Sequence, residues 1–178
     1  MDYGQVNKDT LRQLLEQTPD TPQNRELIAS ISRLLSAKTI EPFPYTYVVS
    51  YWVTGANNSI AAGAANQPGQ VNIQADADFL ILNQTYHANT ANAAIAVSTA
   101  VYPNLLVTLT ETGSGMALMN AGVPVPAIFG DGRQPFILPQ PKLLLAKATL
   151  QVSITSFDAA AGYNLFLAFN GVKLYAYN

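Results

Sequence analysis

Few residues in this chain are suited to catalysis, and His87 is its only histidine. A Ser-His-Asp triad would have to use it, with Asp76 or Asp78 nearby in the sequence. No serine lies in the Gly-x-Ser-x-Gly pattern that exposes a nucleophile between a strand and a helix. A single histidine also rules out a histidine-rich metal site within one chain. We therefore interpret His87 as a surface or interface residue in a loop.

Carboxylates could supply acid/base or metal-binding chemistry. Asp76 and Asp78 are two residues apart, a spacing that puts both on one side of a strand, as in a metal–nucleotide site. Two large apolar residues follow directly, which favours the start of a strand with its polar residues facing outward. Asp131 lies between two glycines, a pattern typical of a tight turn. An acid/base pair stays open, drawn from Asp76, Asp78, Glu111, Asp131 and Asp158.

Aromatic side chains form a third group. Tyr45, Tyr47 and Tyr51 alternate along one predicted strand and share one of its faces, and Trp52 follows them. With tyrosines farther along the chain, they could form a sugar-stacking platform or a subunit interface.

The charge content limits the classes of partner. Only 11% of the residues are charged, against roughly 25% in ordinary domains. The net charge is −2, and Arg133, Lys142 and Lys147 are too few for a nucleic-acid patch, so we expect no nucleic-acid partner. The chain has no cysteine, which excludes disulfides and thiolate metal sites, and we expect no cofactor. We find no signal peptide, and the apolar stretches are too short to span a bilayer, so we expect no membrane partner.

The charged residues are also unevenly placed. Half of them lie before residue 41, so Asn, Gln, Ser, Thr, Ala and Gly must cover most of the remaining surface. Such a surface is easier to desolvate than a charged one. This favours a subunit that is largely covered by neighbours, and the alternative is a secreted β-protein with a neutral surface.

Residues 7–37 predict two short helices, with Thr21 and Pro22 at the start of the second. Helices this short are marginal alone, so their apolar stripes must pack on the β body or on a neighbouring subunit. The run Glu41-Pro42-Phe43-Pro44 predicts a stiff extended link. We therefore divide the chain into a helical N-terminal arm, residues 1–41, and a β-sandwich domain, residues 42–178.

Strand patterns dominate the rest of the chain. Strands are predicted over residues 45–53, 71–83, 105–112, 148–155 and 163–169, with Ile73, Phe79 and Ile81 facing inward. Asn170-Gly171 is the strongest hairpin signal, so residues 135–178 predict a β-meander. The fold class predicted is mainly β: a jelly-roll-like antiparallel β-sandwich with a short α-helical N-terminal arm.

Residues 71–178 resemble small β-sandwich structural proteins of tailed-bacteriophage virions, of the capsid decoration or cement type. The resemblance rests on spacing and turn residues: Asp76-Ala77-Asp78-Phe79, Val123-Pro124-Val125-Pro126, Ile128-Phe129-Gly130, Gln134-Pro135-Phe136, Leu138-Pro139, the strand from Leu150 to Ile154 and the hairpin from Gly162 to Tyr175.

This resemblance implies a virion structural protein that is not an enzyme, is produced in the host cytoplasm, and binds and stabilises the shell of the major capsid protein. It also implies a homo-oligomer, a trimer or other cyclic assembly. The alternative is a carbohydrate-binding or host-recognition β-sandwich module of a phage tail or fibre. The predicted interface residues are Leu11, Leu14, Leu15, Leu27, Ile31, Leu34, Tyr45, Tyr47 and Trp52.

Overall fold

The computed structural model describes residues 8–52, 58–91, 100–112 and 116–177. Their elements, in chain order, are α1 (Lys8–Gln17), the 3₁₀ turn η1 (Pro22–Asn24), α2 (Arg25–Ser36), β1 (Thr39–Tyr51), β2 (Gln67–Asn72), β3 (Asp78–Thr90), β4 (Leu105–Glu111), β5 (Met116–Ala117), β6 (Val123–Pro124), α3 (Val125–Ile128), β7 (Phe136–Leu144), β8 (Thr149–Ser156) and β9 (Tyr163–Tyr177).

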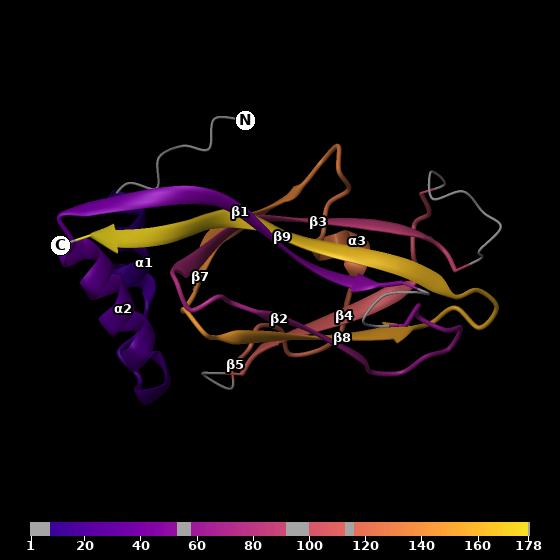
Figure 1. Ribbon diagram of the computed structural model, residues 1–178. Helices are drawn as coiled ribbons and strands as arrows, with labels where there is room; N and C mark the ends of the chain where they lie inside the picture. The colour runs from indigo at the N-terminus through magenta and orange to yellow at the C-terminus, as the bar shows by residue number, and fades with distance from the viewer. Residues whose placement is uncertain (1–7, 53–57, 92–99, 113–115, 178) are drawn as a thin grey trace.

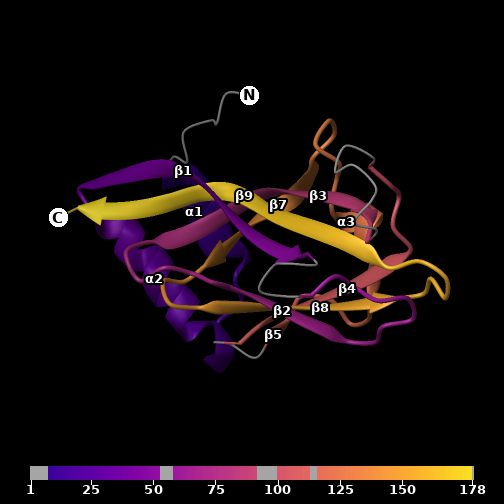
Figure 2. The ribbon, with the colours of Figure 1, turned by 45° about the vertical axis from the view of Figure 1, so that its right-hand side comes forward.

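The strands form two antiparallel sheets that face each other (Figures 1 and 2). Sheet A has the order β1-β9-β3-β7, and sheet B has the order β2-β8-β4-β5, with the short β6 also paired to β4. Apart from β6, the first strand pairs with the last, the second with the second last, and so on to β4 and β5. This nested pairing is a jelly roll, so the predicted fold class is confirmed.

The core lies between the inner faces of the two sheets. Strands β4 and β8 alternate buried, mainly apolar residues with outward residues that are polar except for Leu106, as the sequence predicts. Ile73, Phe79 and Ile81 are also buried, which confirms their predicted inward orientation. Because each fully buried Leu, Ile, Val or Phe contributes about 1.5–3 kcal/mol, this alternation fixes which face of each strand turns inward.

The predicted hairpin at Asn170-Gly171 is wrong, because β9 runs without a break through both residues. A Cβ on Gly171 would lie 1.9 Å from the backbone oxygen of Leu80 in the adjacent strand. Gly171 therefore serves a close approach of two strands and not a turn with positive φ. The predicted β-meander is also wrong, because β8 belongs to sheet B and β9 to sheet A.

Five of the eleven prolines lie in strands at the edges of the sheets. Pro42 and Pro44 lie in β1, Pro68 in β2, and Pro139 and Pro141 in β7. Each of these strands is an edge of its sheet, where a missing N–H need not break a ladder. The predicted extended link at residues 41–44 is thus part of β1, which begins at Thr39.

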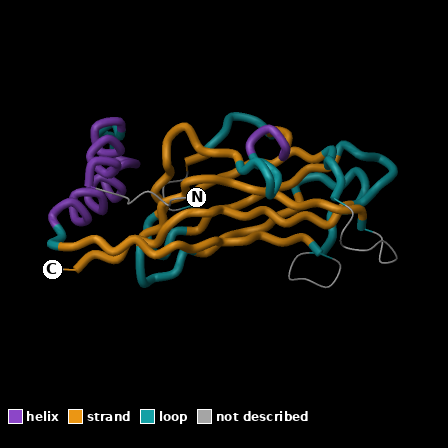
Figure 3. The backbone as a smooth tube through the Cα atoms, turned by 90° about the horizontal axis from the view of Figure 1, so that it is seen from above, coloured by secondary structure: helices purple, strands orange, loops and turns teal. Residues whose placement is uncertain are grey.

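The helical arm lies at one end of the strands, beside the paired ends of β1 and β9 (Figures 1 and 3). It packs there on side chains of sheet A that point away from the main core, on the outer face of that sheet. Its buried side chains meet a second apolar cluster that is separate from the main core. That cluster contains Leu11, Leu14, Ile31 and Leu34 from the arm and Leu80, Leu143, Val172 and Leu174 from the sheet. The arm is therefore docked on its own β domain.

Candidate interaction surfaces

His87 lies on β3 with an exposed side chain, and its ring centre is 6.3 Å from that of Phe166. It is a surface residue, as predicted, although it belongs to a strand and not to a loop. Within the part of the chain that the structure describes, no group of three or more His, Cys, Asp or Glu could hold a metal ion. No helix among the described residues is long and apolar enough to cross a membrane.

Asp78 begins β3 and is buried, with 2% of its surface exposed. Its carboxylate accepts hydrogen bonds from the Ser30 hydroxyl at 2.5 Å, the Arg33 guanidinium at 2.8 Å and the Ala146 N–H at 2.8 Å. Asp78 lies on the outer face of sheet A, as predicted, but α2 covers this end of β3, so its side chain is buried and not exposed to solvent. Asp78 instead attaches the arm to the β domain.

Asp76 lies in the turn before β3 and has different partners. Its carboxylate accepts hydrogen bonds from the Lys173 ammonium at 3.0 Å and from the Tyr175 hydroxyl at 2.7 Å. The Tyr175 bond and then the Lys173 bond lower the pKa of Asp76 below its usual value. Burial is the largest single influence on the pKa of Lys173 and lowers it, but the bond to Asp76 and the charge interactions with Tyr47, Asp76 and Tyr175 together outweigh burial, so that pKa is raised. The two carboxylates thus do not form one metal site.

Two other candidate carboxylates shape turns. Asp131 accepts hydrogen bonds from the backbone N–H groups two and three residues on, which confirms the predicted turn. Asp158 accepts from the N–H groups of Ala160 and Ala161, and its other oxygen accepts from the Tyr163 hydroxyl at 2.6 Å. These bonds, that from Tyr163 first, lower the pKa of Asp158. Both carboxylates thus accept hydrogen bonds from backbone N–H groups of their own turns, as is typical of aspartate in turns.

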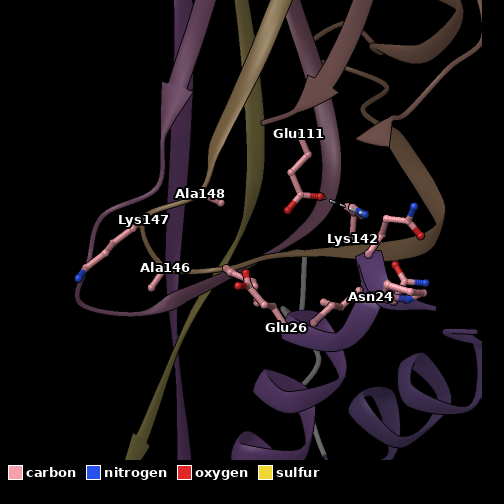
Figure 4. A pocket seen from close by; sticks show the side chains of 11 residues that line it. Asn24, Glu26, Glu111, Lys142, Ala146, Lys147 and Ala148 are labelled. Carbon is pink, nitrogen blue, oxygen red and sulfur yellow. Dashed lines mark ion pairs between the residues drawn. The ribbon is translucent and has the colours of Figure 1, made fainter. Parts of the chain in front are cut away.

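The remaining candidate, Glu111, lines a hollow of about 570 Å³ between the arm and the β domain. Figure 4 shows its carboxylate paired with Lys142, at 3.6 Å, while Asn24 and Glu26 line the hollow from the arm. Glu111 is largely buried and its charge is already matched by a lysine. The hollow therefore lies along the contact between the arm and the β domain. The paired charges of Glu111 and Lys142 do not favour any one class of ligand.

The predicted interface residues of the arm are covered by the same chain. Leu11, Leu14, Ile31 and Leu34 are buried in the second apolar cluster, and Leu15 and Leu27 are partly buried against it. An interface role for them stays a prediction, and it would require the arm to leave its sheet.

The predicted interface aromatics divide between the core and the surface. Tyr47 is buried, with its ring centre 4.8 Å from Phe79, and Tyr45 packs against it with part of its surface exposed. These tyrosines face sheet B, so they do not make an outward sugar-stacking platform. Trp52 is partly exposed at the end of β1, and its ring centre is 5.4 Å from Phe166.

The outer face of sheet B has no charged side chain along its three long strands. We call it the amide face; its outward residues are Pro68, Gln70 and Asn72 of β2, Leu106, Thr108 and Thr110 of β4, and Gln151, Ser153 and Thr155 of β8. The register places Gln70, Gln151 and Thr110 side by side across the sheet. A shallow hollow of about 420 Å³ lies over these residues.

The part of sheet A that the arm leaves uncovered is similarly poor in charge. On three of its strands, the outward residues are Thr46, Val48 and Ser50 of β1, Asn83, Thr85 and His87 of β3, and Phe166, Ala168 and Asn170 of β9. An amide–hydroxyl network crosses it, since Asn170 bonds to both Thr46 and Asn83 at 2.9 Å. Sequence composition indicates this neutral surface, but only the strand register shows that it forms two continuous faces.

No protein-family model matches this sequence, and no curated protein is similar to it. Two solved structures are weakly similar, both with a TM-score of 0.27, 12% identity and 78% of this chain covered. One is a structure of the infectious bursal disease virus Gt strain, and the other is the VP2 subviral particle of infectious bursal disease virus. This chain covers 33% and 37% of those chains, about a third of their length. A likeness this weak carries no argument about function, and the fold described above rests on its own strand order.

Proposed function

We propose that this protein is a non-enzymatic structural subunit of a tailed-bacteriophage virion, of the capsid decoration or cement type. It binds the shell of the major capsid protein and stabilises it. The observation that carries this proposal is the continuous uncharged surface on both sheets, above all the amide face. Neutral amides and hydroxyls can be buried against a partner with their hydrogen bonds exchanged, at much lower cost than charged groups.

The fold supports the same role by analogy. Jelly rolls serve in viral capsid domains and in lectins, so the fold alone does not choose between shell and sugar binding. The candidate carboxylates support a non-enzymatic role, because Asp76, Asp78, Asp131, Asp158 and Glu111 are each engaged by nearby side chains or backbone. Many copies, each with a modest contact, would add their binding free energies into one stable shell.

The composition of purified particles tests the proposal. We expect this chain in a fixed ratio to the major capsid protein, with a copy number in the hundreds, and we expect particles stripped of it to break at lower temperature. A cyclic homo-oligomer, for example a trimer, is the assembly we expect in solution. Absence of the chain from purified particles would refute the proposal.

A carbohydrate-binding module of a tail or fibre is the second candidate. The observation in its favour is the partly exposed Trp52 beside Phe166, with the exposed His87 next to them. Binding of a sugar to these rings would quench the fluorescence of Trp52, the only tryptophan in the chain. Quenching by host-surface glycans, together with absence from the shell, would favour this candidate.

A further inference from the structure

The paired ends of β1 and β9 reach past sheet B and have one uncovered face (Figure 1). On one side of this two-stranded ribbon, Ile40, Val172, Leu174 and Ala176 pack against the arm. The residues between them point to the other side. We call that side the ribbon face; it consists of Glu41, Phe43, Tyr175 and Tyr177. Phe43 is 56% exposed and Tyr177 52%, so the arm and the β domain leave this face open.

The same side of the ribbon already holds one cation, one step closer to the core. The ammonium of Lys173 lies 4.4 Å from the centre of the Tyr45 ring and 3.0 Å from the carboxylate of Asp76. Its side chain is 3% exposed, yet its charge is kept by these partners. An aromatic ring and a carboxylate together therefore hold a positive charge on this surface.

The ribbon face repeats these two chemical groups without a cation of its own. Glu41 pairs in register with Tyr175, and Phe43 with Lys173, so Glu41 has aromatic neighbours on the same face in both strands. Within the described residues, no ion pair involves Glu41. The carboxylates of Glu41 and Asp76 outnumber the single buried Lys173, which leaves this side of the ribbon negative.

We propose that the ribbon face binds an arginine-bearing segment of a partner protein, with the guanidinium between Glu41 and the rings of Phe43, Tyr175 and Tyr177. Arginine fits better than lysine, because its planar group stacks on rings while its N–H groups reach a carboxylate. If the proposed function is correct, this partner is the major capsid protein, and this identification alone rests on the proposed function. The expected binding of arginine follows from the residues of the ribbon face and does not depend on that function.

A hexa-arginine peptide is the probe, added to the full-length protein and followed by titration calorimetry. The test variants are Phe43→Ala and Glu41→Gln. Their matched controls are Phe157→Ala, which truncates an equally exposed phenylalanine on the β8–β9 connection, and Glu16→Gln, which removes an exposed carboxylate from α1. We expect each ribbon variant to bind roughly three- to fivefold more weakly, and each control to bind like the wild type.

Equal weakening in the ribbon variants and their controls would show general attraction to an acidic protein and would overturn the proposal. An NMR titration of the wild type removes any dependence on how the variants fold: the ring signals of Phe43 and Tyr177 should shift on adding the peptide, and unmoved signals would also overturn it. Co-sedimentation with stripped particles separates the two proposals. If the wild type does not bind them, the shell function fails, whereas the peptide titration still decides the ribbon face.

Discussion

Truncating Leu34 tests whether the arm belongs to its own β domain. Leu34 is fully buried between α2 and sheet A. Replacing a buried leucine by alanine costs about 2–5 kcal/mol, from lost burial and the cavity left behind. If the free energy that holds the arm on sheet A falls by about 3 kcal/mol, the fraction of molecules with an undocked arm rises roughly 100-fold. We therefore expect Leu34→Ala to loosen the arm while the sandwich, which lies on the other side of sheet A, stays folded.

Limited trypsin digestion measures this directly, because the arm contains Lys8, Arg12, Arg25, Arg33 and Lys38, five of the nine basic residues in the chain. When opening is fast compared with cleavage, the cleavage rate follows the population of the undocked arm. The fluorescence of Trp52, at the far end of β1, reports on the sandwich in the same sample.

The control is Ser32→Ala, an exposed position on the same helix. Its cleavage rate should match that of the wild type. The reasoning would be refuted if Leu34→Ala were cleaved no faster than Ser32→Ala, since Leu34 would then contribute nothing to docking within one chain. Collapse of the Trp52 signal together with fast cleavage would show that arm and sandwich unfold as one unit.

Three other changes have defined outcomes. Asp78→Ala leaves three donors without their acceptor and should lower the free energy of unfolding by about 2–4 kcal/mol in urea titrations; an unchanged midpoint would contradict the role of Asp78. Gly171→Ala forces a Cβ against the Leu80 carbonyl and should cost about 1–3 kcal/mol, whereas Gly132→Ala, with open space around it, should cost little. Because the pKa of Asp76 is lowered on folding, its stabilisation is present above its usual value of 3.8 and is lost as the pH falls below that value toward the folded pKa. The stability difference between wild type and Asp76→Asn should therefore shrink in acid, and a constant difference would contradict the ion pair.

Much of the sandwich could be predicted from the sequence, because burial on one face of a strand leaves a period of two. The alternation of Leu105, Val107 and Leu109 in β4 is an example, and all three side chains are buried. The helices of the arm could be predicted for the same reason, from apolar residues at helical spacing. The alternation within a strand does not show which other strand pairs with it. The nested strand order therefore cannot be predicted from the sequence pattern and is seen only in the structure.

Each feature that the sequence analysis did not predict correctly has a physical explanation in the structure. Asn170-Gly171 has the residues of a hairpin turn. In the sequence alone, however, a glycine needed for the close approach of a neighbouring strand cannot be told from a glycine needed for positive φ. The burial of Asp78 leaves no signal near it in the sequence, because its partners Ser30 and Arg33 lie on a helix far away along the chain. The docking site of the arm did leave a signal: the unbroken apolar run from Phe79 to Leu82 indicates a strand that is covered on both faces.

The pairing of β1 with β9 determines how the molecule would carry tension. The arm leads directly into β1, and all 13 residues of β1 are in register with β9, from Thr39 opposite Tyr177 to Tyr51 opposite Leu165. If the arm is pulled along the strand while the rest of the domain is held, the hydrogen bonds of this ladder are stretched together, and none can break first to release the others. A subunit that is bound to one neighbour through its arm and to another through its sandwich would therefore resist forces that pull the two neighbours apart.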